Sequence, residues 1–207
     1  MNFKKNKYII IKQAINKDLA TFVANYFAMQ KQVYDTCRNA RYISPYETLL
    51  GYYESSNEQI PNTYSCYSDI AMETLMLKCQ PIMEKTTGLK LYPAYTYARI
   101  YKKGDELKRH KDRFSCEIST TMNLGGDDWP IYLEPSGEEG MKGIRVDLKQ
   151  GDMLVYSGCK LEHWRKPFKG KECIQVFLHY NNRKTPGSKD NMFDKRPHLG
   201  LPSWFKK

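Results

Sequence analysis

One of the four histidines of the chain stands two residues before an aspartate, in the triplet His110-Lys111-Asp112. Side chains two apart in a strand point to the same face, so this imidazole and this carboxylate could hold one cation together. A third ligand must come from another strand, and His163 lies near the start of the strand-like run Leu161–Arg165. Two imidazoles and one carboxylate leave positions of a metal open, which suits ferrous iron that also binds a co-substrate and dioxygen.

Two further residues have the chemistry to bind a dicarboxylate beside this triplet. Lys171 follows His163 by eight residues and begins an apolar, strand-like run. A cation on a strand next to the metal could pair with the distal carboxylate of a dicarboxylate co-substrate. Tyr101, nine residues before His110, could donate a hydroxyl hydrogen bond to the same carboxylate. A His-x-Asp triplet alone is more often a surface ion pair or a turn cap, so the prediction depends on these neighbours.

The secondary structure that must position these residues is predicted to change from helices to strands near residue 91. Before it, Asn16 is a plausible N-cap, and the three-four spacing of apolar residues predicts a helix to about Cys37. A second helical region covers about 68–86, and the polar, turn-rich residues 38–65 between the two predict a long loop that acts as a lid or a substrate-binding segment. After residue 91, strand-like runs separated by Gly-, Pro- and Asp-rich turns cover 95–101, 106–111, 115–124, 130–134, 143–148, 152–156, 161–165 and 172–179.

Helices followed by about eight short strands predict an α+β chain with a double-stranded β-helix, or jelly-roll, core and N-terminal supporting helices. We expect a single domain over 1–207. In it, residues 1–90 supply the helical support and the loop, 91–180 form the jelly-roll core, and 181–207 form a basic C-terminal tail.

The chain carries 33 Lys and Arg against 23 Asp and Glu, a formal net charge of +10. Such an excess fits a nucleic-acid partner, or simply a soluble protein rich in lysine, and no known nucleic-acid-binding motif accompanies it. The six cysteines form no CxxC pair, no stretch approaches the length of a membrane span, and the N-terminal apolar run is too short for a signal peptide. These features predict a cytoplasmic protein with reduced thiols and no membrane partner.

Three runs of the chain resemble the prolyl-hydroxylase branch of the 2-oxoglutarate- and Fe(II)-dependent oxygenases. They are Tyr101-x-x-Gly104…His110-x-Asp112, Gly151-Asp152-Met153-Leu154-Val155-Tyr156 and His163-x-x-x-Pro167…Lys171-x-x-Ile174-x-Val176-Phe177, within roughly residues 91–180. The resemblance implies that His110, Asp112 and His163 bind the iron. It also implies that Lys171 binds the C5 carboxylate of 2-oxoglutarate and that Tyr101 contacts this co-substrate.

The chain departs from the family pattern near both co-substrate residues. The interval from His163 to Lys171 is a residue or two shorter than usual, so Lys171 depends on a tightened turn just before it. The usual tyrosine on the strand after the triplet is absent, and the hydroxyl of Thr121 is expected to replace it. Phe177 matches a position near the substrate pocket of the family. Residues beside the ligands that could also reach the substrate are Trp164 and Arg113.

The resemblance implies an enzyme that hydroxylates a substrate C–H bond, consumes 2-oxoglutarate and O2, and releases succinate and CO2, with ascorbate as a possible reductant. The carboxylate of Asp112 favours hydroxylation, because a halogenating relative would need that ligand position vacant. A prolyl residue of a peptide or protein is the first substrate prediction. A nucleic-acid demethylase is the alternative that the charge favours, although Phe177 stands where those enzymes carry a second Arg. The third possibility is a non-catalytic metal-binding jelly roll.

Overall fold

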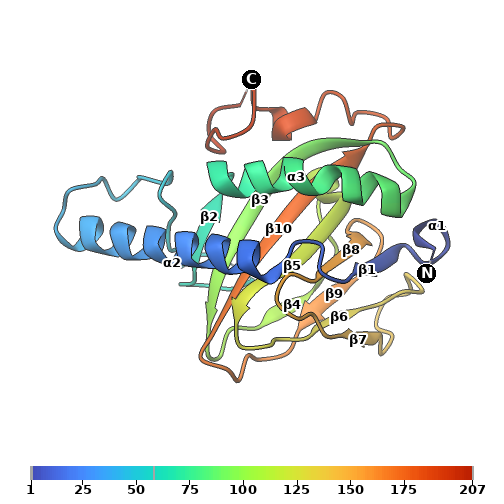
Figure 1. Cartoon of the computed structure of the whole chain (residues 1–207), viewed down its shortest axis with the longest axis horizontal. Coiled ribbons are helices and arrows are strands. Elements are labelled where there is room, and N and C mark those ends of the chain that lie inside the picture. Colours follow the sequence, from blue (N-terminus) through green and yellow to red (C-terminus); the bar gives the residue numbers. More distant parts are fainter. Residues whose placement is uncertain (1, 58, 207) are drawn as a thin grey trace.

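The computed structural model of the chain describes residues 2–57 and 59–206, and two antiparallel sheets dominate it (Figure 1). The six-stranded sheet has the order β1-β8-β5-β10-β3-β2, and the four-stranded sheet has the order β4-β9-β6-β7. The elements are α1 (Phe3–Asn6), β1 (Tyr8–Ile11), α2 (Lys17–Asn39), β2 (Tyr64–Tyr67), α3 (Ile70–Thr87), β3 (Leu91–Lys102), β4 (Leu107–His110), the 3-10 turn η1 (Phe114–Cys116), β5 (Ile118–Gly126), β6 (Ile131–Leu133), β7 (Ile144–Val146), β8 (Met153–Ser157), β9 (His163–Arg165), β10 (Glu172–Asn182) and the 3-10 turn η2 (Met192–Lys195).

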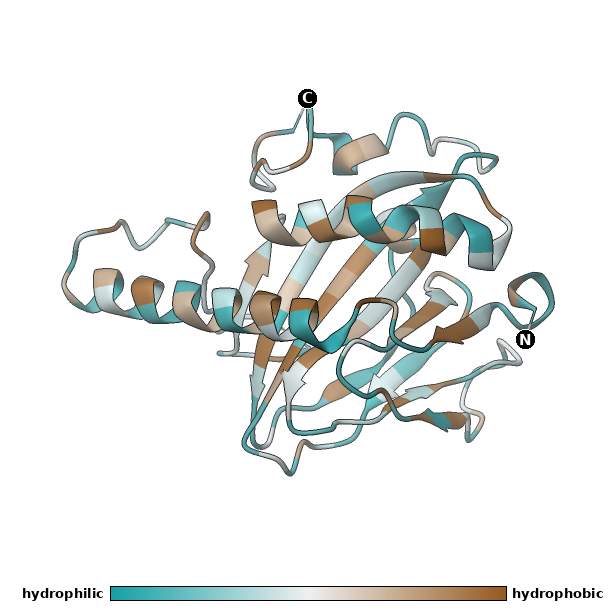
Figure 2. Ribbon diagram, viewed as in Figure 1, coloured by the Kyte–Doolittle hydropathy of each residue, from teal (hydrophilic) through white to brown (hydrophobic). Residues whose placement is uncertain are grey.

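The two faces of the six-stranded sheet have different side chains because successive residues of a strand point to opposite sides. On β3, Ala98 and Ile100 belong to the main apolar core, whereas Tyr97 and Arg99 line a cavity on the other face. Helices α2 and α3 cover the apolar face (Figure 1), and hydrophobic positions, brown in Figure 2, occupy the strands behind them. One face of this sheet therefore packs into the hydrophobic core, and the other lines the cavity. This is the predicted jelly roll with N-terminal supporting helices.

Both predicted helices are present and have the caps that their sequences indicate. The Asn16 side chain accepts a hydrogen bond of 2.9 Å from the backbone N–H of Leu19, which begins α2. Asp69 caps α3 in the same way, and Gly88 ends that helix with a φ of 69° that favours glycine. Pro81 lies inside α3 without ending it.

All eight predicted strands are present in shortened or lengthened form, and two local predictions were wrong. Residues 64–67, which the sequence assigned mostly to a loop, form the edge strand β2 and pair with β3. Cys116, expected in a strand, lies in the turn η1, so β5 begins only at Ile118. The strand β3 also begins earlier than predicted, at Leu91.

Polar contacts attach the C-terminal segment beside α3 (Figure 1). Arg196 and Glu73 form an ion pair of 2.8 Å in which both side chains are buried. Asp194 in η2 accepts hydrogen bonds from Arg113 at 2.9 and 3.0 Å. Trp204, by contrast, is 69% exposed. The buried Arg196–Glu73 ion pair, the hydrogen bonds to Asp194 and the packing of Leu199 against the main core hold this segment in place.

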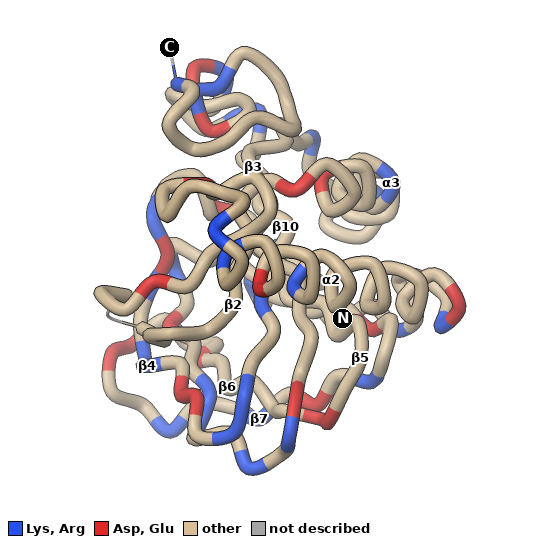
Figure 3. Tube along the Cα trace, turned by 90° about the vertical axis from the view of Figure 1, so that its left-hand side faces the viewer, with Lys and Arg blue, Asp and Glu red and all other residues tan. Residues whose placement is uncertain are grey.

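Positively and negatively charged residues are mixed along the chain. Lys and Arg positions, blue in Figure 3, recur along the strands, loops and C-terminal segment, and Asp and Glu positions lie among them. The six cysteines are free thiols. Within residues 2–57 and 59–206, no helix combines the length and the apolar character that crossing a membrane requires.

Candidate metal centre

The structure brings together the three predicted ligands from two neighbouring strands and the loop after one of them. His110, the last residue of β4, pairs directly with His163, the first residue of β9. Asp112 lies two residues beyond His110, and its backbone N–H donates to the carbonyl of Gly158. The Asp112 Oδ1 atom is 3.7 Å from His110 Nε2 and 3.5 Å from His163 Nε2. The three ligand atoms all lie within 4.8 Å of one another.

Backbone carbonyls fix which nitrogen of each imidazole is free to bind a metal. His110 Nδ1 is 2.8 Å from the carbonyl oxygen of Lys108, and His163 Nδ1 is 3.2 Å from that of Leu161. A carbonyl can only accept, so each Nδ1 carries the proton and each Nε2 offers its lone pair toward Asp112. An octahedral ion with bonds of roughly 2.1 Å separates neighbouring ligand atoms by about 3 Å. A small inward movement of the three side chains would therefore accommodate the ion, and the two-nitrogen, one-oxygen set suits Fe(II).

The protonation states also fit a metal site. Burial and the nearby His163 lower the pKa of His110, which favours its neutral, metal-binding form. Burial alone would raise the pKa of Asp112, but the neighbouring imidazole of His163 and the hydroxyl of Ser119 outweigh it and hold this pKa well below its usual value. Asp112 is therefore a carboxylate. A Cβ atom at Gly158 would collide with this carboxylate, so only glycine leaves room for it.

A cavity of about 390 Å3 opens beside the three ligands. Its walls come from the interior faces of both sheets and from the loop before β2. Phe177, which the sequence predicted near the substrate, is one of its walls. The lining residues are Tyr52, Glu54, Asn57, Gln59, Tyr95, Tyr97, Arg99, Leu107, His110, Asp112, Cys116, Ile131, Tyr156, His163, Phe177 and His179.

No family model matches the chain, and neither does any curated protein. Solved structures do match it. A prolyl-4-hydroxylase of Pseudomonas putida is 15% identical, with a TM-score of 0.55 over 87% of this chain and 95% of that one. HygX of Streptomyces hygroscopicus, solved with nickel and 2-oxoglutarate bound, is 11% identical, with a TM-score of 0.55 over 88% of this chain and 85% of that one.

A third match is a prolyl hydroxylase of Trichoplax adhaerens, solved with a peptide fragment of the hypoxia inducible factor oxygen degradation domain. It is 14% identical and has a TM-score of 0.61 over 88% of this chain and 86% of that one. The chain has the fold of the 2-oxoglutarate oxygenases. At these identities the likeness concerns the oxygenase fold alone, so the chemistry has to be argued from the residues of this chain.

Two residues predicted near the substrate lie outside the cavity of this oxygenase fold. Trp164 stands between the inward-facing His163 and Arg165, so the alternation of the strand turns its ring to the outer face, where it stacks on Tyr132. Arg113 follows Asp112 directly, but its guanidinium pairs with Asp194. Sequence proximity to a ligand did not predict side-chain direction.

The residues predicted to bind the co-substrate have different surroundings. Lys171 lies in an exposed turn before β10, where its backbone N–H donates to Asp127 at 2.6 Å. Lys171, Thr121 and Tyr101 do not line the cavity, and neither does Arg165. Thr121 is fully buried on β5 and accepts a hydrogen bond of 3.0 Å from Arg165. Tyr101 is also buried, with its ring edge-on to Trp129. Arg165 is not among the site residues predicted from the sequence, although its spacing of two from His163 could have placed it on the interior face.

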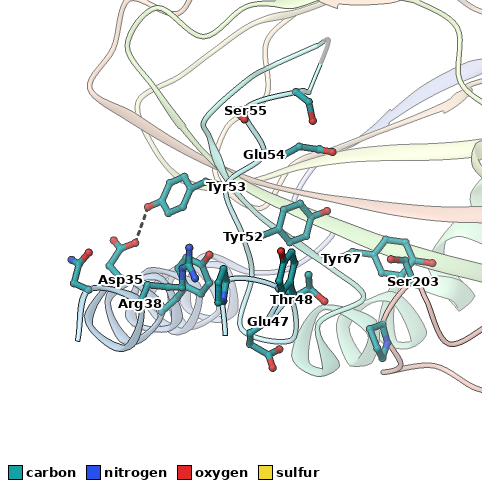
Figure 4. Close-up of a pocket in the computed structure, with 16 residues that line it drawn as sticks. Asp35, Arg38, Glu47, Thr48, Tyr52, Tyr53, Glu54, Ser55, Tyr67 and Ser203 are labelled. Atoms are coloured by element: carbon teal, nitrogen blue, oxygen red, sulfur yellow. Dashed lines mark hydrogen bonds between the residues drawn. The ribbon is translucent and has the colours of Figure 1, made fainter. Parts of the chain in front are cut away.

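A second hollow, of about 680 Å3, shares the lining residues Tyr52 and Glu54 with the metal cavity. Figure 4 shows its walls: the end of α2, the loop after it, and the C-terminal segment near Ser203. Tyr53 donates to Asp35 across it at 2.9 Å. We call this hollow the tyrosine groove, since Tyr34, Tyr46, Tyr52, Tyr53 and Tyr67 line it.

Proposed function

We propose that this chain is an Fe(II)- and 2-oxoglutarate-dependent dioxygenase that hydroxylates a C–H bond of its substrate and releases succinate and CO2. The observation that carries the proposal is the cluster of His110, Asp112 and His163, whose metal-binding atoms converge beside a cavity of the oxygenase fold. A non-catalytic metal site needs no chamber next to its ligands. The cavity of about 390 Å3 therefore favours an enzyme.

His110 and His163 would hold the iron through Nε2, and Asp112 through its carboxylate. The bound iron, with 2-oxoglutarate and O2, would supply the oxidising chemistry, and ascorbate would keep the metal reduced. The chain supplies the geometry: backbone carbonyls orient both imidazoles. The fully buried ring of Tyr156 packs 4.7 Å from that of His163 and keeps water from one side of the site.

The substrate we propose is a prolyl residue of a peptide or protein. Two of the three neighbours described above are prolyl hydroxylases, and one of them was solved with a peptide. The tyrosine groove shares Tyr52 with the metal cavity and offers aromatic faces, on which proline-containing segments bind well. Phe177 and Tyr95 continue this aromatic lining inside the cavity.

Succinate production tests the enzymatic part of the proposal. With Fe(II), ascorbate and 2-oxoglutarate, the protein is expected to form succinate, faster when substrate is present. His163→Ala should abolish this turnover because it removes an iron ligand, and His198→Ala, which removes an exposed histidine, should leave it unchanged. Absence of succinate from wild-type protein with bound metal, whichever substrates are offered, would refute the proposal.

The substrate class is tested by mass spectrometry of a proline-containing peptide library after incubation. The expected result is a gain of one oxygen on peptides that contain proline, and not on matched peptides in which alanine replaces it. Methylated oligonucleotides are incubated in parallel. Demethylation of these, without any change in the peptides, would assign the enzyme to nucleic acids instead.

A further inference from the structure

Arg165 is a buried cation without a counter-charge. Its side chain is 1% exposed, and it reaches from β9 in the small sheet to β5 and β10 in the large one. Its Nη2 atom donates to Thr121 Oγ1 at 3.0 Å and to Gln175 Oε1 at 3.4 Å, and Nη1 donates to the carbonyl of Trp129. Its Nε atom is buried and has no partner. Among residues 2–57 and 59–206, no carboxylate lies within ion-pair distance of it.

The groups around Arg165 do not supply negative charge. Burial raises the pKa of the Cys173 thiol and of the Tyr101 hydroxyl, the latter to about 12, so both are neutral near pH 7. An unpaired buried charge costs several kcal/mol, and buried charges in proteins are generally paired. A guanidinium in this state, with one N–H unused, fits a site that is completed by an anionic ligand.

The position of Arg165 identifies the part of the ligand that it would meet. It follows His163 by two residues on the same strand, so both side chains point between the sheets about 7 Å apart along β9. A five-carbon 2-oxo acid held by the metal at its keto end extends over about this distance. We propose that Arg165, and not Lys171, binds the far carboxylate of 2-oxoglutarate, with the Thr121 hydroxyl beside it. This inference rests on the proposed function and names the residue that selects the co-substrate.

Besides Arg165, two other cations are candidates. Arg99 is also buried with an unpartnered Nε and lines the cavity, but it lies on β3, where it donates to the Tyr97 hydroxyl at 3.2 Å, and not on the strand of His163. Lys171 is exposed, and the carboxylate of Asp127 fixes its backbone in the turn. The first interior position of β10 is Cys173, a small neutral residue that leaves room for the guanidinium of Arg165 and does not repel it. The positive charge of this part of the barrel is thus supplied from β9.

The test compares two ligands that differ only at the far end. 2-Oxopentanoate has the keto acid and chain length of 2-oxoglutarate but a methyl group in place of the distal carboxylate. Their Kd values are measured anaerobically by calorimetry on the Fe(II)-loaded protein. Wild type should bind 2-oxoglutarate about 100-fold more tightly, as expected for a desolvated charge pair. Arg165→Met should bind both acids equally and weakly, and Lys171→Met should keep the wild-type preference.

The other possible outcomes contradict the assignment of Arg165 as the carboxylate-binding residue. If Arg165→Met keeps the preference while Lys171→Met or Arg99→Met loses it, the carboxylate binds elsewhere. If wild type binds 2-oxoglutarate no better than 2-oxopentanoate, Arg165 is not an anion site, but the proposed function stands. If the metal-loaded wild type binds neither acid, the proposed function fails as well.

Thermal unfolding separates ligand binding from a purely structural role. Without ligand, Arg165→Met should be at least as stable as wild type, because it removes an uncompensated buried charge and retains an apolar side chain of similar length. The rise in Tm that 2-oxoglutarate produces in wild type should disappear. A variant that is destabilised but still gains Tm from 2-oxoglutarate would overturn the proposal. Arg165→Lys, which retains the charge, should preserve part of the ligand preference and is available if the methionine variant does not fold.

Discussion

The Asp112 carboxylate is oriented by a short chain of hydrogen bonds as well as by the two imidazoles. Ser119 Oγ on β5 donates to Asp112 Oδ2 at 2.7 Å and lies 3.0 Å from His179 Nδ1 on β10. Burial lowers the pKa of His179 to about 4, so this ring is neutral and its Nδ1–H can donate to Ser119. With Oδ2 occupied in this way, Oδ1 is the oxygen that faces both histidines.

Replacing Ser119 by alanine should therefore weaken metal binding without removing a ligand. Loss of such an orienting hydrogen bond typically lowers metal affinity about 10- to 100-fold. Calorimetric titration with Co(II) under anaerobic conditions measures the change, and Ser55→Ala, at an exposed serine of the loop before β2, is the control. An unchanged Kd in Ser119→Ala would mean that the two histidines alone orient Asp112.

The His-x-Asp triplet and the motifs around it together predicted that the three candidate ligands come together, and the structure brings them together. The directions of the neighbouring side chains were not predicted. Trp164 and Arg165 are both close to His163, yet the alternation of β9 turns one outward and the other inward. Lys171 was placed by its distance from His163, but this interval includes a turn whose geometry no pattern in the sequence fixes.

At the scale of elements, η2 ties the C-terminal segment to the loop that carries a candidate ligand. Asp194 accepts hydrogen bonds from both terminal nitrogens of Arg113, from Ser115 at 2.6 Å and from Tyr67 at 2.6 Å. Arg113 directly follows Asp112, so the segment stabilises the connection between β4 and β5. Its attachment at η2 consists of polar contacts, which hydrophobic periodicity cannot reveal. This is why the sequence predicted a tail but not how it is held.

Asp194→Asn should destabilise the fold by about 2 kcal/mol at pH 7 and lower Tm by roughly 5 °C, because it removes a buried carboxylate that pairs with the half-exposed Arg113 and accepts from Ser115 and Tyr67. Burial opposes ionisation of Asp194, but hydrogen bonds from Arg113, Ser115 and Tyr67 outweigh it and hold its pKa well below the usual value. A lowered pKa contributes stability above the unfolded value of about 4, which is lost as the pH falls through the folded value.

Urea unfolding at several pH values between about 7 and 3 measures this contribution. The difference between wild type and Asp194→Asn should stay constant down to about pH 4 and shrink below it. Asp190→Asn, at an exposed aspartate of the same segment, is the control and should match wild type. A difference that remains constant down to pH 3 would exclude ionised Asp194 as the source of the stability.

The interior strands of the six-stranded sheet were easier to predict from the sequence than its edge strand β2. Residues 64–67 carry little apolar alternation, and they form β2 only because β3 offers a free edge to pair with. Tertiary pairing of this kind overrides local preference, so β2 was read as loop. The interior strands, by contrast, bury apolar side chains on the face under α2 and α3. This burial requires apolar residues at alternate positions, which can be recognised in the sequence.

Across the whole molecule, parts from both ends of the chain converge on the path to the metal ligands. The end of α2, the loop before β2 and the C-terminal segment form the tyrosine groove, and the space between the two sheets holds the metal cavity, with Tyr52 and Glu54 lining both. Tyr52 stands at the junction, with its hydroxyl 3.3 Å from that of Tyr97 on β3. A peptide that reached the metal along this path would have to pass Tyr52.

Tyr52→Ala is therefore expected to raise the KM for a hydroxylated peptide about tenfold, since an aromatic contact near the centre of an interface typically contributes more than 1 kcal/mol. The Kd for 2-oxoglutarate and the slow succinate formation without peptide should not change, because the contacts proposed for the co-substrate lie on β5 and β9. Tyr42→Ala is the matched control: Tyr42 belongs to the same loop, is 85% exposed and does not line the groove. If both variants raise the KM equally, or neither does, the peptide reaches the metal by another route.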